Sequence, residues 1–163
     1  MPRAGLKSRA THGNPAEVGW ETSQVAKAFT EVFYHFVWAT REREPLIDAE
    51  LERHLYRQIR HKCEELKIRV HALNGIPDHV HLACTLPVTV SIATAMQQLK
   101  GSSSHFVNHL ASADRRFDWQ AGYGALTFAK RDLPRIVAYV DRQLEHHAQG
   151  TLSTKMERFT DED

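Results

Sequence analysis

The order of strand-like and helix-like segments predicts an α+β fold built on a four-stranded antiparallel sheet. Three observations lead to this prediction: an aromatic and β-branched segment at 29–40, an amphipathic helical pattern at 48–66, and two short strand-like runs within 68–86. A further helix, a short strand and a last helix follow. The resulting β-α-β-β-α-β order with one added helix is that of a ferredoxin-like domain. We expect its helices on one face of the sheet, leaving the other face free for a ligand or partner.

The first strand and the first helix have the clearest patterns. Residues 29–40 are dense in aromatic and β-branched side chains, which favour a strand buried on at least one face. After Pro45, Asp48 is expected to cap a helix by accepting hydrogen bonds from first-turn amides. The apolar residues of this helix recur every three or four positions: Leu51, Leu55, Ile59, Cys63 and Leu66.

Two strand-like runs, 68–73 and 79–86, follow this helix with only five residues between them. The Asn74-Gly75 dipeptide in that connection favours a tight hairpin turn, because both residues tolerate a positive φ. We therefore expect a hairpin whose returning strand begins at His79.

The second half contains two more helices and a strand. A helix is expected from about Val90, and the run 101–104 leaves open whether it is one bent helix or two. A Gly-punctuated stretch at 119–129 ends in a short strand, and Asp132 is expected to cap the last helix. The core-facing residues of that helix fall within an arc of about 100°: Leu133, Ile136, Val137, Val140 and Leu144.

The composition fits one soluble domain in a reducing compartment. The chain has 163 residues, a formal charge of +1 and two cysteines, which form neither a disulfide framework nor a zinc spacing. No apolar run is long enough to span a bilayer, so we expect a cytoplasmic protein. We divide the chain into a mobile N-terminal extension at 1–27, one domain at 28–148, and a polar, loose C-terminal tail at 149–163.

The pair His79 and His81 is the first candidate for chemistry. Residues i and i+2 of a strand lie on one face, with Cα atoms about 6.5 Å apart, so two imidazoles can converge on one divalent ion. Two histidines also occupy strands without any function, and a metal site needs more ligands. The position directly after a turn favours the metal interpretation, because such side chains border a cleft.

Tyr139 and Gln143 supply the second half of the candidate site. On one helix these residues share a face, and they project about 100° away from the centre of the apolar arc. Tyr139 is therefore expected to border the polar face, although a helical tyrosine is by default a packing residue. With Tyr139 as nucleophile and Gln143 as a third ligand beside the histidines, the set suits phosphoryl transfer at a DNA backbone.

Imidazole and amide ligands with open positions suit Mg²⁺ or Mn²⁺ as the working ion. Four further residues are candidate contacts to DNA phosphates because they carry donors near the run 101–104 or near Tyr139. They are Lys100, Ser102, Arg135 and Arg142.

With these motifs placed, residues 34–147 resemble the single-tyrosine HUH transposases of small insertion sequences, the IS200-like transposases that include the repeat-associated tyrosine transposases. The similarity lies in five ordered segments: Tyr34-His35-Phe36-Val37-Trp38, Pro77-Asp78-His79-Val80-His81-Leu82, Gln98-Leu99-Lys100-Gly101, Trp119-Gln120-Ala121-Gly122-Tyr123-Gly124, and Tyr139 through His147.

The resemblance implies an endonuclease and strand transferase that binds single-stranded DNA with subterminal hairpins. In it, His79, His81 and Gln143 hold the metal, and Tyr139 takes the 5′-phosphate and frees a 3′-hydroxyl. It also implies a homodimer, with a monomer as the alternative. Two other functions stay open: a domesticated hairpin-binding protein without strand transfer, and a metal-dependent phosphoesterase that does not need Tyr139.

Overall fold

The computed structural model describes residues 29–110 and 116–159, so the N-terminal extension expected at 1–27 lies outside the described residues. The helices and strands, in chain order, are β1 (Phe33–Ala39), η1 (Arg41–Arg43), α1 (Ala49–Glu65), β2 (Arg69–Ile76), β3 (His79–Thr85), α2 (Ile92–Leu110), β4 (Gly124–Phe128), η2 (Lys130–Asp132), α3 (Leu133–Asp141) and α4 (Gln143–Gln149). None of the helices within these described ranges has the length and hydropathy needed to cross a membrane.

The four strands form one antiparallel sheet in the order β2-β3-β1-β4, which confirms the predicted fold class. Both inner strands, β1 and β3, have partners on both sides. Asp48 caps α1 as predicted, since its side chain accepts from the amides of Glu50 and Leu51 at 3.0 and 2.8 Å.

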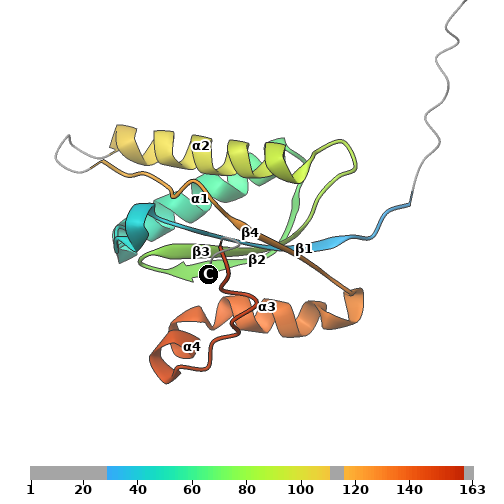
Figure 1. Ribbon diagram of the computed structural model, residues 1–163. Helices are drawn as coiled ribbons and strands as arrows, with labels where there is room; N and C mark the ends of the chain where they lie inside the picture. The colour runs from blue at the N-terminus through green and yellow to red at the C-terminus, as the bar shows by residue number, and fades with distance from the viewer. Residues whose placement is uncertain (1–28, 111–115, 160–163) are drawn as a thin grey trace, which may run out of the picture.

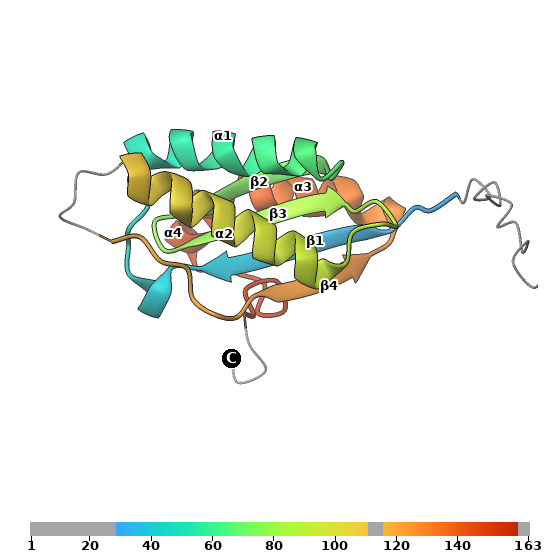
Figure 2. The ribbon, with the colours of Figure 1, turned by 90° about the horizontal axis from the view of Figure 1, so that it is seen from above.

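Helices α1 and α2 lie on one face of the sheet, as Figures 1 and 2 show. The core between them is built from alternate strand residues, such as Phe36 and Trp38 of β1 and Leu82 of β3, which pack against Leu55 and Leu99 of the helices. The residues between them in sequence, including His35, His79 and His81, therefore point to the opposite face.

That opposite face is not free, contrary to our expectation. Helices α3 and α4 and the segment after Gln149 cover it, as Figure 1 shows below the sheet. The tail expected to be loose contributes buried Met156 and Phe159, which pack on β2, β3 and β1 residues. Burial of these two apolar side chains stabilises the packing of this segment on the sheet.

The hairpin turn lies three residues after the Asn74-Gly75 dipeptide where it was expected. Strand β2 continues through Asn74 and Gly75 to Ile76, which pairs with His79, so the connection is Pro77-Asp78. Gly75 is needed inside the ladder for a different reason. A Cβ atom at Gly75 would lie 2.1 Å from the carbonyl oxygen of His79.

Helix α2 is one continuous helix through the run 101–104, which settles the alternative left open. The serines there bond back to carbonyls one turn earlier, such as Ser103 to Leu99 at 2.6 Å. The last helix, by contrast, is two helices. The backbone leaves helical geometry at Arg142, with φ −105° and ψ 27°, so Leu144 is 64% exposed and not a core residue. Contrary to our expectation, the Asp132 side chain accepts no capping hydrogen bond from the amides of α3, which starts directly from η2.

We predict that Gly75→Ala lowers the free energy of unfolding by about 2 kcal/mol, because the β2 and β3 backbones must separate to admit the methyl group. Urea unfolding followed by circular dichroism measures this. Gly101→Ala is the matched control: its Cβ would have nothing within 4 Å, and replacing a helical glycine stabilises by about 1 kcal/mol. Equal stability of Gly75→Ala and the unchanged chain would contradict the close approach.

Candidate functional site

His79 and His81 are both completely buried on the face of β3 that α3 covers. Each ring is fixed through its Nδ1 atom. Nδ1 of His79 donates to the Asp78 carboxylate at 2.6 Å, and Nδ1 of His81 lies 3.0 Å from Nε2 of His35. Partners of this kind orient imidazoles that bind metals through the other nitrogen. The Nε2 atoms of both rings are thus presented together on one side of the sheet.

His35 also lies at the candidate site, although the sequence alone gave it no role beyond its place in the segment Tyr34 to Trp38. It lies on β1 opposite Ala83 of β3, and its ring is diagonally next to that of His81, with ring centroids 5.1 Å apart. Burial, together with the charge of His81, lowers the pKa of His35 to about 3. His35 is therefore neutral, and in its Nδ1–H tautomer its Nε2 accepts a hydrogen bond from His81.

Tyr139 on α3 reaches the same region, with its ring centroid 6.1 Å from that of His81. The structure corrects our expectation that this tyrosine borders the polar face, because it is 9% exposed and packs beside Ile136, Val140 and Met156. The C-terminal segment covers the side of α3 that a helical wheel leaves to solvent.

Gln143 is completely buried at the start of α4. Its side-chain amide nitrogen donates to the Tyr139 carbonyl oxygen at 3.3 Å, one of the last-turn carbonyls of α3. This bond turns the amide so that its oxygen has no hydrogen-bond partner among the described residues. A buried oxygen without a partner is in keeping with the predicted role of Gln143 as a ligand.

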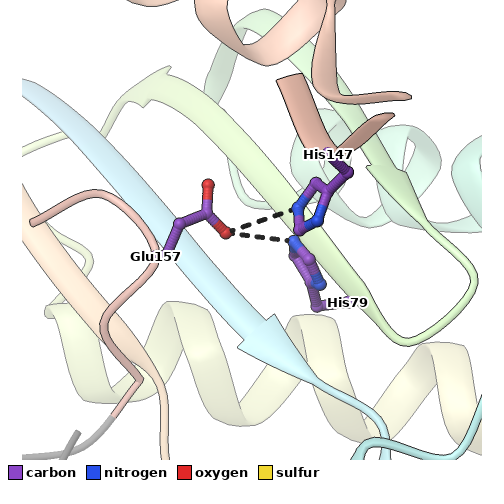
Figure 3. Close-up of side chains that lie close together, drawn as sticks. All are labelled: His79, His147 and Glu157. Atoms are coloured by element: carbon purple, nitrogen blue, oxygen red, sulfur yellow. Dashed lines mark ion pairs between the residues drawn. The ribbon is translucent and has the colours of Figure 1, made fainter. Parts of the chain in front are cut away.

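Two residues that the sequence did not assign to the site also enter it: His147 of α4 and Glu157 of the C-terminal segment. Glu157 Oε2 lies 3.3 Å from Nε2 of His79, 3.4 Å from Nε2 of His81 and 3.8 Å from Nε2 of His147. Figure 3 shows Glu157, His79 and His147 converging from three separate elements. The other oxygen of Glu157 accepts a short hydrogen bond from the Tyr139 hydroxyl.

The two adjacent histidines of α4 also reach this region. His146 and His147 are adjacent in the sequence near the end of the last predicted helix, a position that favours interaction with the negative end of a helix. In the structure His147 faces His79, with ring centroids 5.0 Å apart, and the ring of His146 stacks on Tyr139 at 4.8 Å. Both histidines therefore belong to the surroundings of the candidate site.

The pKa values of the groups at the site depend on burial and on one another. Burial acts to raise the pKa of Glu157, but its contacts with His79 and His81 hold that pKa well below its usual range, so the carboxylate is ionised. Burial, aided by the Glu157 carboxylate, raises the pKa of Tyr139 to about 12. Burial also lowers the pKa of His81. At neutral pH the site holds a neutral phenol beside an ionised carboxylate.

The residues fit a divalent metal ion. Among the buried side-chain atoms of the described residues that have no hydrogen-bond partner are Oε1 of Gln143 and four atoms that lie together: Nε2 of His79, His81 and His147, and Oε2 of Glu157. Buried polar atoms are nearly always satisfied, so a cluster of unsatisfied ones calls for an ion or water. Imidazole nitrogen with carboxylate and amide oxygen is a donor set that Mn²⁺ and related ions accept.

The four candidate DNA contacts do not line this cluster. The Lys100 ammonium donates to three carbonyl oxygens, those of Gln120, Ala121 and Gly122, and thereby holds the segment before β4. The Ser102 hydroxyl donates to a carbonyl of its own helix at 3.4 Å.

The two arginines are exposed on α3 and at the α3–α4 junction. Arg135 lies 3.7 Å from Asp132, and Arg142 donates to the Ala138 carbonyl at 3.2 Å. Both arginines are exposed, whereas Lys100 and Ser102 are half-buried.

The chain is similar to known proteins over most of its length. Residues 28–143 match the family model described as "Transposase IS200 like". The transposase of insertion sequence element IS200 from Salmonella typhimurium is 28% identical over 123 residues, which cover 72% of this chain and 80% of that protein. The ISDra2 transposase TnpA of Deinococcus radiodurans is 24% identical over 115 residues, 68% of this chain and 82% of its own.

Two solved structures share the fold. A putative transposase from Deinococcus radiodurans superposes with a TM-score of 0.57 and 24% identity, over 72% of this chain and 95% of that one. A REP-associated tyrosine transposase bound to a REP hairpin has a TM-score of 0.57 and 16% identity, over 74% and 70% of the two chains.

The fold and the matches define a DNA transposase, an enzyme class that cleaves DNA and transfers its strands. The chain belongs to the IS200-like transposase family.

Proposed function

We propose that this transposase cleaves and rejoins single-stranded DNA through a 5′-phosphotyrosine on Tyr139, with a divalent metal held by His79, His81 and Gln143. One observation carries the proposal. The carboxylate of Glu157 contacts the Tyr139 hydroxyl through one oxygen and the Nε2 atoms of both histidines through the other, so nucleophile and cation site lie next to each other in a single chain. The expected chemistry needs a nucleophile and a cation site next to each other.

In the proposed reaction the Tyr139 oxygen forms a bond to the phosphorus atom. The bond from phosphorus to the 3′ oxygen breaks, and that oxygen leaves as a 3′-hydroxyl, so the proton lost by the phenol is balanced by the proton that the leaving oxygen takes up. A bound divalent ion would polarise the phosphate and offset charge developing on the leaving oxygen. Because the phosphodiester is exchanged for a phosphotyrosine, its energy is kept for rejoining by the reverse step.

The protein's own contribution is orientation and exclusion of water. Asp78 and His35 fix the two imidazoles, and Gln143 is tied to the last turn of α3. The Tyr139 hydroxyl is held by Glu157 and by the amide of Ser153, which donates to it at 3.2 Å. A phenol whose pKa is raised to about 12 reacts only after a nearby cation favours its phenolate. Without a bound metal ion the Tyr139 phenol would therefore stay protonated and unreactive.

The proposed substrate is single-stranded DNA with a hairpin. The related REP-associated transposase, solved with a REP hairpin, supports a hairpin ligand for this fold. Exposed Arg135 and Arg142 lie on the same side of the sheet as Tyr139 and would contact backbone phosphates. Tyr139 meets the histidines of its own chain, which supports a site acting in cis, either in a monomer or in each subunit of a homodimer.

The test is a denaturing gel with end-labelled single strands carrying the palindromes that flank the gene. Incubation with Mn²⁺ or Mg²⁺ is expected to give a protein–DNA adduct and a free 3′-hydroxyl fragment, and EDTA is expected to prevent both. Mass spectrometry should place the adduct on Tyr139. Metal-independent hairpin binding without any adduct would instead support a domesticated binding protein, and free products without an adduct would support a phosphoesterase.

A further inference from the structure

Glu157 occupies the point where the imidazoles converge, although the proposed ligand set does not include it. One carboxylate oxygen, Oε2, faces Nε2 of His79, His81 and His147 at 3.3, 3.4 and 3.8 Å. All four atoms are buried and have no hydrogen-bond partner among the described residues. Glu157 thus contacts every imidazole of the cluster through a single atom.

These distances resemble the spacing of ligands around one ion. Ligand atoms about 2.1 Å from a metal are separated by about 3.4 Å at tetrahedral angles and about 3.0 Å at right angles. The His79 and His81 contacts of 3.3 and 3.4 Å fall in this range, and the His147 contact of 3.8 Å is slightly longer.

A plain ion pair explains the geometry less well. An imidazolium that donates to a carboxylate does so at about 2.7–2.9 Å along the N–H direction. The Asp78–His79 contact at 2.6 Å is such a hydrogen bond, whereas none of the three Glu157–histidine contacts is short or directed enough to count as one. His79 therefore makes a short hydrogen bond to Asp78 on one side and a longer contact to Glu157 on the other, and the longer contact is not a hydrogen bond.

The C-terminal segment is built to place this carboxylate. Gly150 ends α4 in the left-handed conformation at φ 65°, which turns the chain back toward the sheet. Met156 and Phe159, on either side of Glu157, are 6% and 4% exposed. The backbone then passes so close to β4 that a Cβ at Gly124 would lie 2.1 Å from the carbonyl oxygen of Arg158.

We infer that Glu157 is a ligand of the divalent metal, that His147 is a further ligand, and that the C-terminal segment therefore completes the metal centre in cis. The inference rests on the proposed metal-dependent function and extends its ligand set. It also links the metal to the nucleophile, because Glu157 binds the Tyr139 hydroxyl through Oε1 while Oε2 faces the histidines. One carboxylate thereby positions the phenol relative to the ion.

The test measures binding of Mn²⁺ to the full chain without DNA. The loss of the free-ion signal in electron paramagnetic resonance reports the bound fraction. Glu157→Gln keeps the shape and removes the charge, and it is expected to weaken Mn²⁺ binding about tenfold or more. His147→Ala is expected to weaken it in the same direction. Glu145→Gln, an exposed change on α4, is the matched control and should bind as the unchanged chain does.

Two further variants separate the possible failures. If His79→Ala loses Mn²⁺ binding while Glu157→Gln binds as tightly as the unchanged chain, Glu157 is only a counter-charge and this inference is wrong. If His79→Ala also binds unchanged, the proposed metal centre itself fails. Circular dichroism in EDTA checks folding. Should the glutamine variant unfold, Glu157→Asp takes its place, and unaltered Mn²⁺ affinity there would again overturn the inference.

Discussion

Tyr139→Phe is expected to abolish the covalent protein–DNA adduct and to slow DNA cleavage by at least about 10³-fold, because it removes the only atom proposed to attack phosphorus. The substitution keeps the ring, so packing against Ile136, Val140 and Met156 and stacking on His146 at 4.8 Å are preserved. Loss of the hydroxyl's bonds to Glu157 and Ser153 should cost about 1 kcal/mol of stability. Single-turnover cleavage of a labelled hairpin strand, with an adduct gel in parallel, measures the effect.

The matched control is Tyr123→Phe. Tyr123 is half-buried and packs against the core between the sheet and helices α1 and α2, away from Tyr139. It should cleave and form adduct at the level of the unchanged chain. A Tyr139→Phe variant that still yields adduct would show that another residue is the nucleophile. Continued cleavage without adduct would mean hydrolysis by water, as in the phosphoesterase alternative.

The fold could be predicted because the order of strand-like and helix-like segments is readable from local patterns. Phe36 and Trp38 point to α1 and α2, whereas His35 and the residues opposite it in β3 point away. The same alternation placed His79 and His81 on one face, and it required nothing from distant parts of the chain. Local periodicity was sufficient for each of these conclusions.

The rest of the candidate site depends on contacts that no local pattern contains. Glu157 is followed by a polar ending and shares no periodicity with the histidines, so only the fold brings it to His79. Tyr139 was assigned to a polar border from a helical wheel that left the outer face to solvent, and the C-terminal segment covers that face. His35 could have been found only from the register of β1 on β3, which sets it opposite Ala83 and diagonally next to His81.

His81→Ala is expected to remove tight metal binding and, with it, metal-dependent cleavage, each by at least about 100-fold, because one imidazole ligand is lost and His35 is left with a buried, unpaired Nε2. A thermal measurement shows this without DNA. Metal at 100 times its dissociation constant should stabilise the unchanged chain by about 2.7 kcal/mol, and the variant should gain almost nothing at that concentration.

The control for this prediction is His71→Ala on neighbouring β2, where the ring contacts Thr85 at 2.9 Å and takes no part in the cluster. It should keep the full stabilisation by metal. Asp78→Asn tests the orienting bond instead of a ligand, and a loss of about 10- to 100-fold in metal affinity is expected because Nδ1 of His79 loses a charged acceptor. Equal stabilisation of His81→Ala and the unchanged chain would remove His81 from the ligand set. A graded order, with the ligand losing more than its orienting partner, is what a metal centre on β3 requires.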